Sequence, residues 1–149
     1  ELGANGKLIW KIPGDLPRFK KLTWGHPVIM GRKTYDTFQY KGGPLPGRTN
    51  IVITRDPNFS QEGFQVAHSY EEAVDIAKKS KGSEEIFVIG GGQIYELALP
   101  TADRLYLTVV NDTADADVFF PDYSHFRKEL HCDLQEVGGL KFEYVTLEE

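Results

Sequence analysis

Short apolar runs alternate with helix-like segments between residues 28 and 110, and this alternation constrains the fold most strongly. Apolar residues bounded by turn residues predict buried strands, at 28–30, 50–54, 64–67, 86–89 and 105–110. Apolar spacing and capping residues predict helices, at 15–22, 35–38, 70–79 and 93–97. This pattern indicates an α/β fold with a mainly parallel central sheet and helices on both faces.

The end of the chain predicts a hairpin. Residues 130–137 and 140–147 alternate well enough for two antiparallel strands, and Gly138 and Gly139 between them are typical of a two-residue turn. We expect this hairpin to add antiparallel strands at one side of the sheet. With 149 residues, of which 40% are hydrophobic, the chain is predicted to form a single domain over 1–149.

The charge balance favours a small anionic ligand over nucleic acid. The net charge of -5, from 17 basic and 22 acidic residues, argues against broad binding to nucleic acid but allows a local basic pocket. No membrane-length apolar run or signal-peptide pattern is found, so we expect neither a membrane partner nor secretion. The single cysteine, Cys132, cannot form an internal disulfide; we predict a cytoplasmic location and interpret Cys132 as inert packing.

Asp15 is a carboxylate among large apolar side chains. Residues 12–14 (Ile-Pro-Gly) favour an extended entry, and Pro17 is tolerated only in a first turn, so a helix is predicted to begin near Asp15. The apolar residues at 8–10 would desolvate the carboxylate and raise its pKa, as at many functional sites. Aspartate is also a common helix N-cap, and both interpretations stay open here.

Two glycine turns are candidates for ligand binding. Residues 31–34 (Gly-Arg-Lys-Thr) follow a strand and open a helix, where backbone N–H groups can point at a phosphate. Residues 90–92 (Gly-Gly-Gly) precede another helix and would let a ligand approach the backbone closely. Neither is a Walker A or dinucleotide fingerprint, and a tight structural turn is the alternative for each.

The acidic loop with Asp112, Asp115 and Asp117 lacks the later bidentate glutamate of a calcium loop. We interpret these side chains as solvated or loop-ordering groups and predict no metal site.

Four ordered motifs together resemble dihydrofolate reductase of the bacterial type. They are Trp10 with 12–16, then 28–34, then 44–50 (Pro-Leu-Pro-Gly-Arg-Thr-Asn), then 89–95. The resemblance continues through 119–122 to the C-terminal hairpin and implies that family's three-layer sandwich. The family normally begins with a central apolar strand, and this sequence starts after it, so we expect the domain to be N-terminally incomplete.

The resemblance implies reduction of 7,8-dihydrofolate to 5,6,7,8-tetrahydrofolate, a step of one-carbon metabolism, by hydride transfer from NADPH. Asp15 matches the pterin-binding acid: it can accept two hydrogen bonds from an aminopyrimidine edge and favour protonation at N5. The implied catalytic group is Asp15, Trp10 and Leu8. We expect a monomer that binds dihydrofolate and antifolate inhibitors such as trimethoprim and methotrexate.

The resemblance also implies two sets of binding residues. Arg48 matches the residue that holds the carboxylate of the glutamate tail, and Arg55 would supply charge for the 2′-phosphate. The peptide bond between Gly90 and Gly91 is expected to be cis. The implied substrate-binding residues are Asp15, Leu16, Phe19, Thr37, Phe38, Leu45, Arg48, Ile89, Tyr95 and Thr108. The implied cofactor-binding residues are Gly3, Asn5, Gly31, Arg32, Lys33, Thr34, Thr54, Arg55, His68, Ile89, Gly91, Gly92, Gln93, Ile94 and Tyr95.

Two other functions stay open. One is a related pterin or flavin-precursor reductase of the same fold, although Asp15 and Arg48 together favour folate. The other is a catalytically inactive module that binds NADPH or folate.

Overall fold

The computed structural model describes residues 3–4, 7–8, 15–38, 45–110, 126, 128–137 and 140–148. Two compact units are present: one is Leu16–Ala98, and the other combines Glu1–Asp15 with Leu99–Glu149. The expected single domain stays a prediction. Within the described residues, no helix has the length and apolar character needed to cross a membrane.

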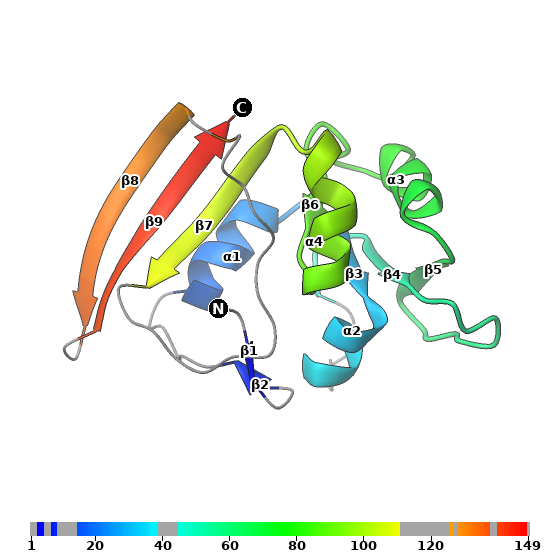
Figure 1. The fold of residues 1–149 in the computed structure, drawn as a ribbon. Helices are drawn as coiled ribbons and strands as arrows, with labels where there is room; N and C mark the ends of the chain where they lie inside the picture. Colours follow the sequence, from blue (N-terminus) through cyan, green and yellow to red (C-terminus); the bar gives the residue numbers. More distant parts are fainter. Residues whose placement is uncertain are drawn as a thin grey trace. The chain divides into compact units, whose positions relative to one another are not determined.

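A four-stranded parallel sheet forms the centre of the unit Leu16–Ala98 (Figure 1). Its strand order is β5–β4–β3–β6, and its strands are β3 (Val28–Gly31), β4 (Asn50–Ile53), β5 (Phe64–Ala67) and β6 (Phe87–Val88). All three pairings are parallel, which confirms the predicted mainly parallel sheet. Strand β6 is shorter than the predicted 86–89, although the amide of Ile89 still donates to the carbonyl of Ile29 at 2.9 Å.

The helices lie close to their predicted positions. They are α1 (Asp15–Thr23), α2 (Arg32–Phe38), α3 (Tyr70–Lys78) and α4 (Gly92–Ala98), followed by the 3₁₀ turn η1 (Leu99–Thr101). The amide of Glu72 donates to the hydroxyl of Ser69 at 3.1 Å, so Ser69 caps α3 as predicted. Helix α2 begins at Arg32, directly after the last residue of β3, which is earlier than the predicted 35–38.

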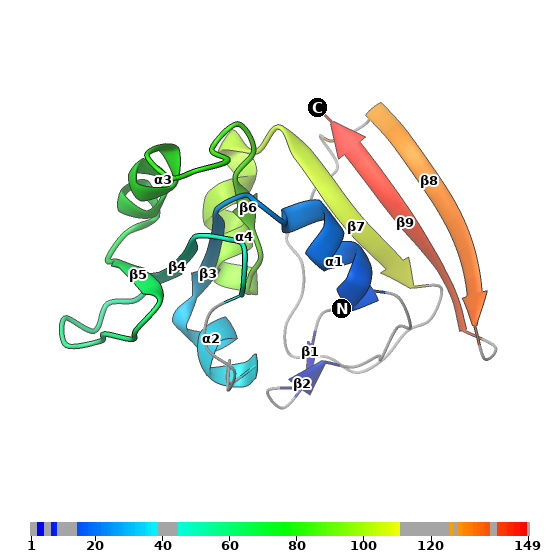
Figure 2. The same ribbon diagram turned by 180° about the vertical axis from the view of Figure 1, so that it is seen from behind.

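Side chains from helices cover both faces of the parallel sheet. On one face, Ile29 and Ile51 pack with Ala73 and Ala77 of α3 and with Ile94 of α4. On the other face, the fully buried side chains of Val28, Met30 and Val52 pack against Tyr35 of α2, together with Phe59 and Phe64. Figure 2, seen from behind, has β3 and β4 in front of α4. The unit is therefore a three-layer arrangement, as expected for the fold class.

The unit that includes Leu99–Glu149 contains a three-stranded antiparallel sheet. Its strands are β7 (Arg104–Val110), β8 (Lys128–Val137) and β9 (Leu140–Glu148), in the order β7–β9–β8. Strands β8 and β9 form the predicted hairpin, with Val137 opposite Leu140; Gly138 and Gly139 lie outside the described residues. A two-residue ladder joins β1 (Gly3–Ala4) and β2 (Lys7–Leu8).

Strand β7 differs from the expectation that it would continue the parallel sheet. It pairs antiparallel with β9, where Leu105 lies opposite Leu147. Leu105 and Leu147 pack with Leu99 and Phe126 in a separate cluster. The apolar run at 105–110 predicts that a strand forms, but periodicity does not specify which strand is its partner.

Polar contacts at the surface of this sheet correct one expectation. Cys132 is exposed, and its thiol donates to a carboxylate oxygen of Glu143 at 3.2 Å, so the interpretation of Cys132 as inert packing is wrong. Alternation along an antiparallel strand turned this small side chain outward. On strand β7, hydrogen bonds to Tyr106 and Glu148 raise the pKa of the Arg104 guanidinium above its usual range.

Candidate functional site

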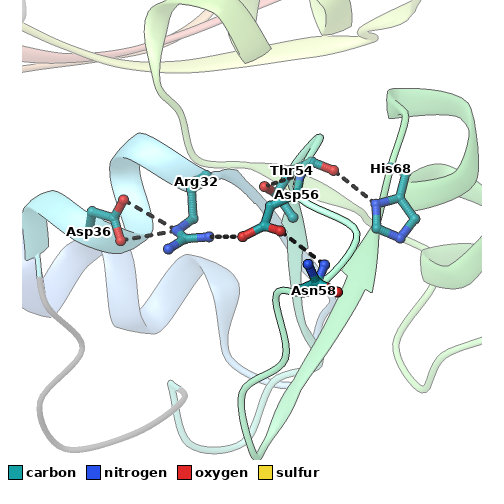
Figure 3. A network of polar contacts seen from close by, with 6 residues as sticks. All are labelled: Arg32, Asp36, Thr54, Asp56, Asn58 and His68. Carbon is teal, nitrogen blue, oxygen red and sulfur yellow. Dashed lines mark hydrogen bonds and ion pairs between the residues drawn. The ribbon is translucent and has the colours of Figure 1, made fainter.

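The register of the parallel sheet brings three polar residues to one edge. Gly31, Ile53 and Ala67 lie side by side as the last paired residues of their strands. The residues that follow them in the chain are Arg32, Thr54 and His68, so these side chains begin at the same edge of the sheet (Figure 3). Ligands of open α/β sheets bind outside the carboxyl ends of the strands, which makes this edge the candidate site.

Thr54 holds this edge together. Its amide donates to the carbonyl of Ala67 at 2.9 Å, and its buried hydroxyl accepts from the amide of Asp56 at 3.1 Å. Its carbonyl lies 3.0 Å from Nδ1 of His68. A carbonyl oxygen only accepts, so Nδ1 of His68 carries the proton and Nε2 is directed away from Thr54.

Arg32 joins the start of α2 to the turn after β4. Its Nε donates to both carboxylate oxygens of Asp36, at 3.1 and 3.2 Å, and its Nη1 lies 3.7 Å from Oδ2 of Asp56 (Figure 3). The guanidinium carbon also lies 4.2 Å from the centre of the Phe59 ring. The amide of Asn58 donates to Asp56 at 2.9 Å, which orients that carboxylate toward Arg32. Arg32 is therefore fixed by an aromatic face and by two acidic residues.

The two glycine turns lie beside each other. The amide of Gly31 donates to the carbonyl of Gly90 at 2.8 Å. A Cβ atom at Gly31 would lie 2.8 Å from Cγ1 of Ile94, and one at Gly91 would lie 3.4 Å from the hydroxyl of Thr34. The peptide bond between Gly90 and Gly91 is cis, which confirms that expectation. Helices α2 and α4 thus start close together, with backbone and hydroxyl groups between them.

Arg48 lies at the opposite, amino-terminal edge of the sheet, just before β4. Its Nη1 donates to the hydroxyl of Thr23 at 2.9 Å, and its Nε donates to the carbonyl of Pro46 at 3.0 Å. The buried side chain of Asn50 accepts from the amide of Leu45 and donates to the carbonyls of Leu45 and Arg48, at 3.0 to 3.1 Å. These bonds hold the loop that carries Arg48.

The remaining predicted site residues divide into three groups. Ile89 is half-buried against the cluster of Val28, Met30 and Val52. Tyr95 packs near Gly90. Three predicted residues are exposed: Lys33, Arg55 and Gln93. Asn5 and Trp10 lie outside the described residues, as do the acidic residues at 112, 115 and 117. For the following residues the structure describes the backbone position and not the side chain: Gly3, Leu8, Asp15, Leu16, Phe19, Thr37, Phe38, Gly92 and Thr108.

Sequence reasoning missed several residues that support the site. Thr23 and Asn50 position the Arg48 loop, and Asp56 and Phe59 position Arg32. A buried asparagine at the start of a strand is a detectable signal, because its amide must find partners there. The local sequence around Asp56 and Phe59 gives no comparable indication of their contacts.

Among the described side chains, no group of three or more His, Cys, Asp or Glu residues could hold a metal ion.

Basic and hydroxyl side chains beside two glycine turns, at the carboxyl edge of a parallel sheet, define an α/β protein with a candidate ligand site at that edge. Comparison with known proteins identifies the family within this class. The family model described as dihydrofolate reductase matches residues 1–148, and the chain belongs to the dihydrofolate reductase family.

Relatives of the chain include bacterial enzymes and a solved structure. Dihydrofolate reductase type 3 of Salmonella typhimurium is 44% identical over 122 residues, which cover 82% of this chain and 72% of that protein. Dihydrofolate reductase of Bacillus subtilis (strain 168) is 43% identical over 122 residues, which cover 82% of this chain and 69% of that protein. The structure of dihydrofolate reductase from Enterococcus faecalis, complexed with NADP(H) and RAB-propyl, aligns with a TM-score of 0.87 and 32% identity. The alignment covers 99% of this chain and 88% of that one.

Proposed function

We propose that this chain reduces 7,8-dihydrofolate to 5,6,7,8-tetrahydrofolate with NADPH. The observation that carries the proposal is the register that brings Arg32, Thr54 and His68 to one edge of the sheet, beside the paired turns at Gly31 and Gly90. Membership of the dihydrofolate reductase family supports it, and so do the relatives described as bacterial dihydrofolate reductases.

The donor groups between the glycine turns fit a dinucleotide cofactor. Cβ atoms at Gly31 and Gly91 would contact Ile94 and Thr34, so glycine at both positions lets the starts of α2 and α4 approach each other closely. The first backbone N–H groups of a helix have no partner within the helix and suit phosphate oxygens. We assign the phosphates to the starts of α2 and α4, and the adenosine end to Thr54, Arg55 and His68. Bound NADPH would supply the hydride.

Asp15, the first residue of α1, is proposed to bind the pterin ring of the substrate and to promote its protonation. A carboxylate there would accept two hydrogen bonds from the aminopyrimidine edge of the pterin and hold the ring in one orientation. Its negative charge would also favour the pterin protonated at N5. Leu8, Trp10, Leu16, Phe19, Thr37, Phe38 and Thr108 are proposed to enclose the ring, with Ile89 and Tyr95 at the cofactor side.

Arg48 is proposed to bind the carboxylate of the glutamate tail. The bonds to Thr23 and Pro46 hold its guanidinium at the amino edge of the sheet, away from the proposed cofactor phosphates at the carboxyl edge. In this proposal Asp15 binds the ring at one end of the substrate, and Arg48 binds the carboxylate at the other end. We further propose that the chain acts as a cytoplasmic monomer in which dihydrofolate and antifolate inhibitors compete for this site.

Oxidation of NADPH in the presence of dihydrofolate tests the proposal. We expect turnover by the chain, and a fall in kcat/KM of about 100-fold or more for Asp15→Asn, because the variant cannot favour the protonated ring. Asp75→Asn on the exposed side of α3 removes one charge elsewhere and should retain the rate. Binding of NADPH without turnover would contradict the proposal and identify an inactive nucleotide-binding module instead.

Cofactor choice is tested separately with Arg55→Gln. Loss of the charge proposed to face the 2′-phosphate should raise the KM for NADPH by about tenfold and leave the KM for NADH unchanged. Equal changes for both cofactors would place Arg55 away from the 2′-phosphate.

A further inference from the structure

Trp24 is a large aromatic residue at the surface of the unit Leu16–Ala98, with 51% of its area exposed. It follows the last residue of α1, and its amide donates to the carbonyl of Lys20 at 3.0 Å.

The Trp24 ring lies directly against the loop that carries Arg48. A Cβ atom at Gly47 would lie 2.6 Å from Cζ2 of Trp24, so the ring occupies the space that any other residue at 47 would need. The amide of Gly25 donates to the carbonyl of Gly47 at 2.9 Å and joins the backbone beside Trp24 to the same loop. Backbone hydrogen bonds at Trp24 and at Gly25 thus fix the main chain that carries the ring.

The same ring contacts two cations. The guanidinium carbon of Arg48 lies 5.6 Å from the ring centre, and Nζ of Lys20 lies 5.5 Å from it. A cation within about 6 Å of an indole ring is attracted by its negative face. Together with the bonds from Arg48 to Thr23 and Pro46, the ring is a third restraint on the guanidinium.

We propose that Trp24 is a positioning residue for Arg48: it holds the guanidinium in place to receive the carboxylate of the substrate tail. This inference rests on the proposed function, in which Arg48 binds that carboxylate. Lys20 adds a second positive charge at the same ring. The two cations beside Trp24 would therefore attract an anionic tail and discriminate against substrates that lack one.

Trp24→Ala tests this inference when two substrates are compared. One is dihydrofolate, and the other is a 7,8-dihydropterin without the aminobenzoylglutamate tail. We expect the variant to raise the KM for dihydrofolate about two- to fivefold, with kcat and the KM for NADPH unchanged. The KM for the tail-less pterin should not change, and Trp24→Phe should be intermediate because its ring is a weaker partner for cations.

A double-mutant cycle separates positioning from general packing. In a chain that already carries Arg48→Gln, the change Trp24→Ala should produce no further rise in the KM for dihydrofolate. An unchanged KM in Trp24→Ala, or an equal rise for both substrates, would overturn the inference and leave the proposed function standing. A wild-type chain that reduces neither substrate would overturn the proposed function, and the inference with it.

Discussion

Nη1 of Arg32 lies 3.7 Å from Oδ2 of Asp56, and this pair connects the start of α2 with the turn after β4. Asp36 contacts the same guanidinium from within α2, at 3.1 Å. The charge of Arg32 is therefore balanced by two carboxylates at the edge where the 2′-phosphate of NADPH is proposed to bind. A phosphate bound there would be attracted by Arg32 and repelled by Asp56.

Removal of the Asp56 charge should strengthen binding of NADPH. In Asp56→Asn the side-chain oxygen can still accept from the amide of Asn58, so the turn is retained. We expect the KM for NADPH to fall by up to about fivefold, which is typical of an exposed charge, while the KM for NADH stays the same. High salt should reduce the difference. If Asp75→Asn on α3 had the same effect, the change would reflect net charge and not the Arg32 pair.

Gly31→Ala should reduce both stability and cofactor binding. The new methyl group would lie 2.8 Å from Cγ1 of Ile94, and the buried Ile94 would have to move. We expect the free energy of unfolding to fall by about 1–3 kcal/mol and the KM for NADPH to rise. Urea unfolding and steady-state kinetics measure the two effects, and a fully stable variant with normal kinetics would show that the two turns are not closely packed.

Asn50 should control the loop that carries Arg48. Asn50→Ala removes the hydrogen bonds to Leu45 and Arg48 from a buried position, which should cost about 1–3 kcal/mol. Asn50→Asp keeps the size and the bond from the Leu45 amide, but it places a carboxylate against two carbonyl oxygens. We expect both variants to unfold at lower urea concentration and to raise the KM for dihydrofolate. Retained stability in Asn50→Asp would mean that the amide donors contribute little.

Gly82 and Gly25 form a matched pair for a test of stability. Both have left-handed backbones, with φ of 76° and 82°, so alanine costs about 1 kcal/mol at each from conformation. A Cβ atom at Gly82 would overlap the carbonyl oxygen of Gly25, whereas one at Gly25 meets nothing within 4 Å. Gly82→Ala should therefore lose about 3 kcal/mol or more, and Gly25→Ala much less. Similar losses in thermal unfolding would show that the close approach relaxes without cost.

Local signals in the sequence predicted much of the fold because their causes are local. Ser69 and Glu72 stand at the spacing of a helix cap, and β5 has the predicted bounds because turn residues flank its apolar run. The four ordered motifs include the glycine turns at Gly31 and Gly90, and the structure places these two turns in contact.

The sequence by itself determined where strands, helices and glycine turns form, since each depends on neighbours in the chain. Only the tertiary structure decided which of these segments meet. The sheet register aligned Arg32, Thr54 and His68, antiparallel pairing took β7 to β9, and packing set the Trp24 ring against Gly47 and Arg48. These contacts join residues far apart in the chain, and they depend on strand pairing and side-chain shape, which periodicity does not encode.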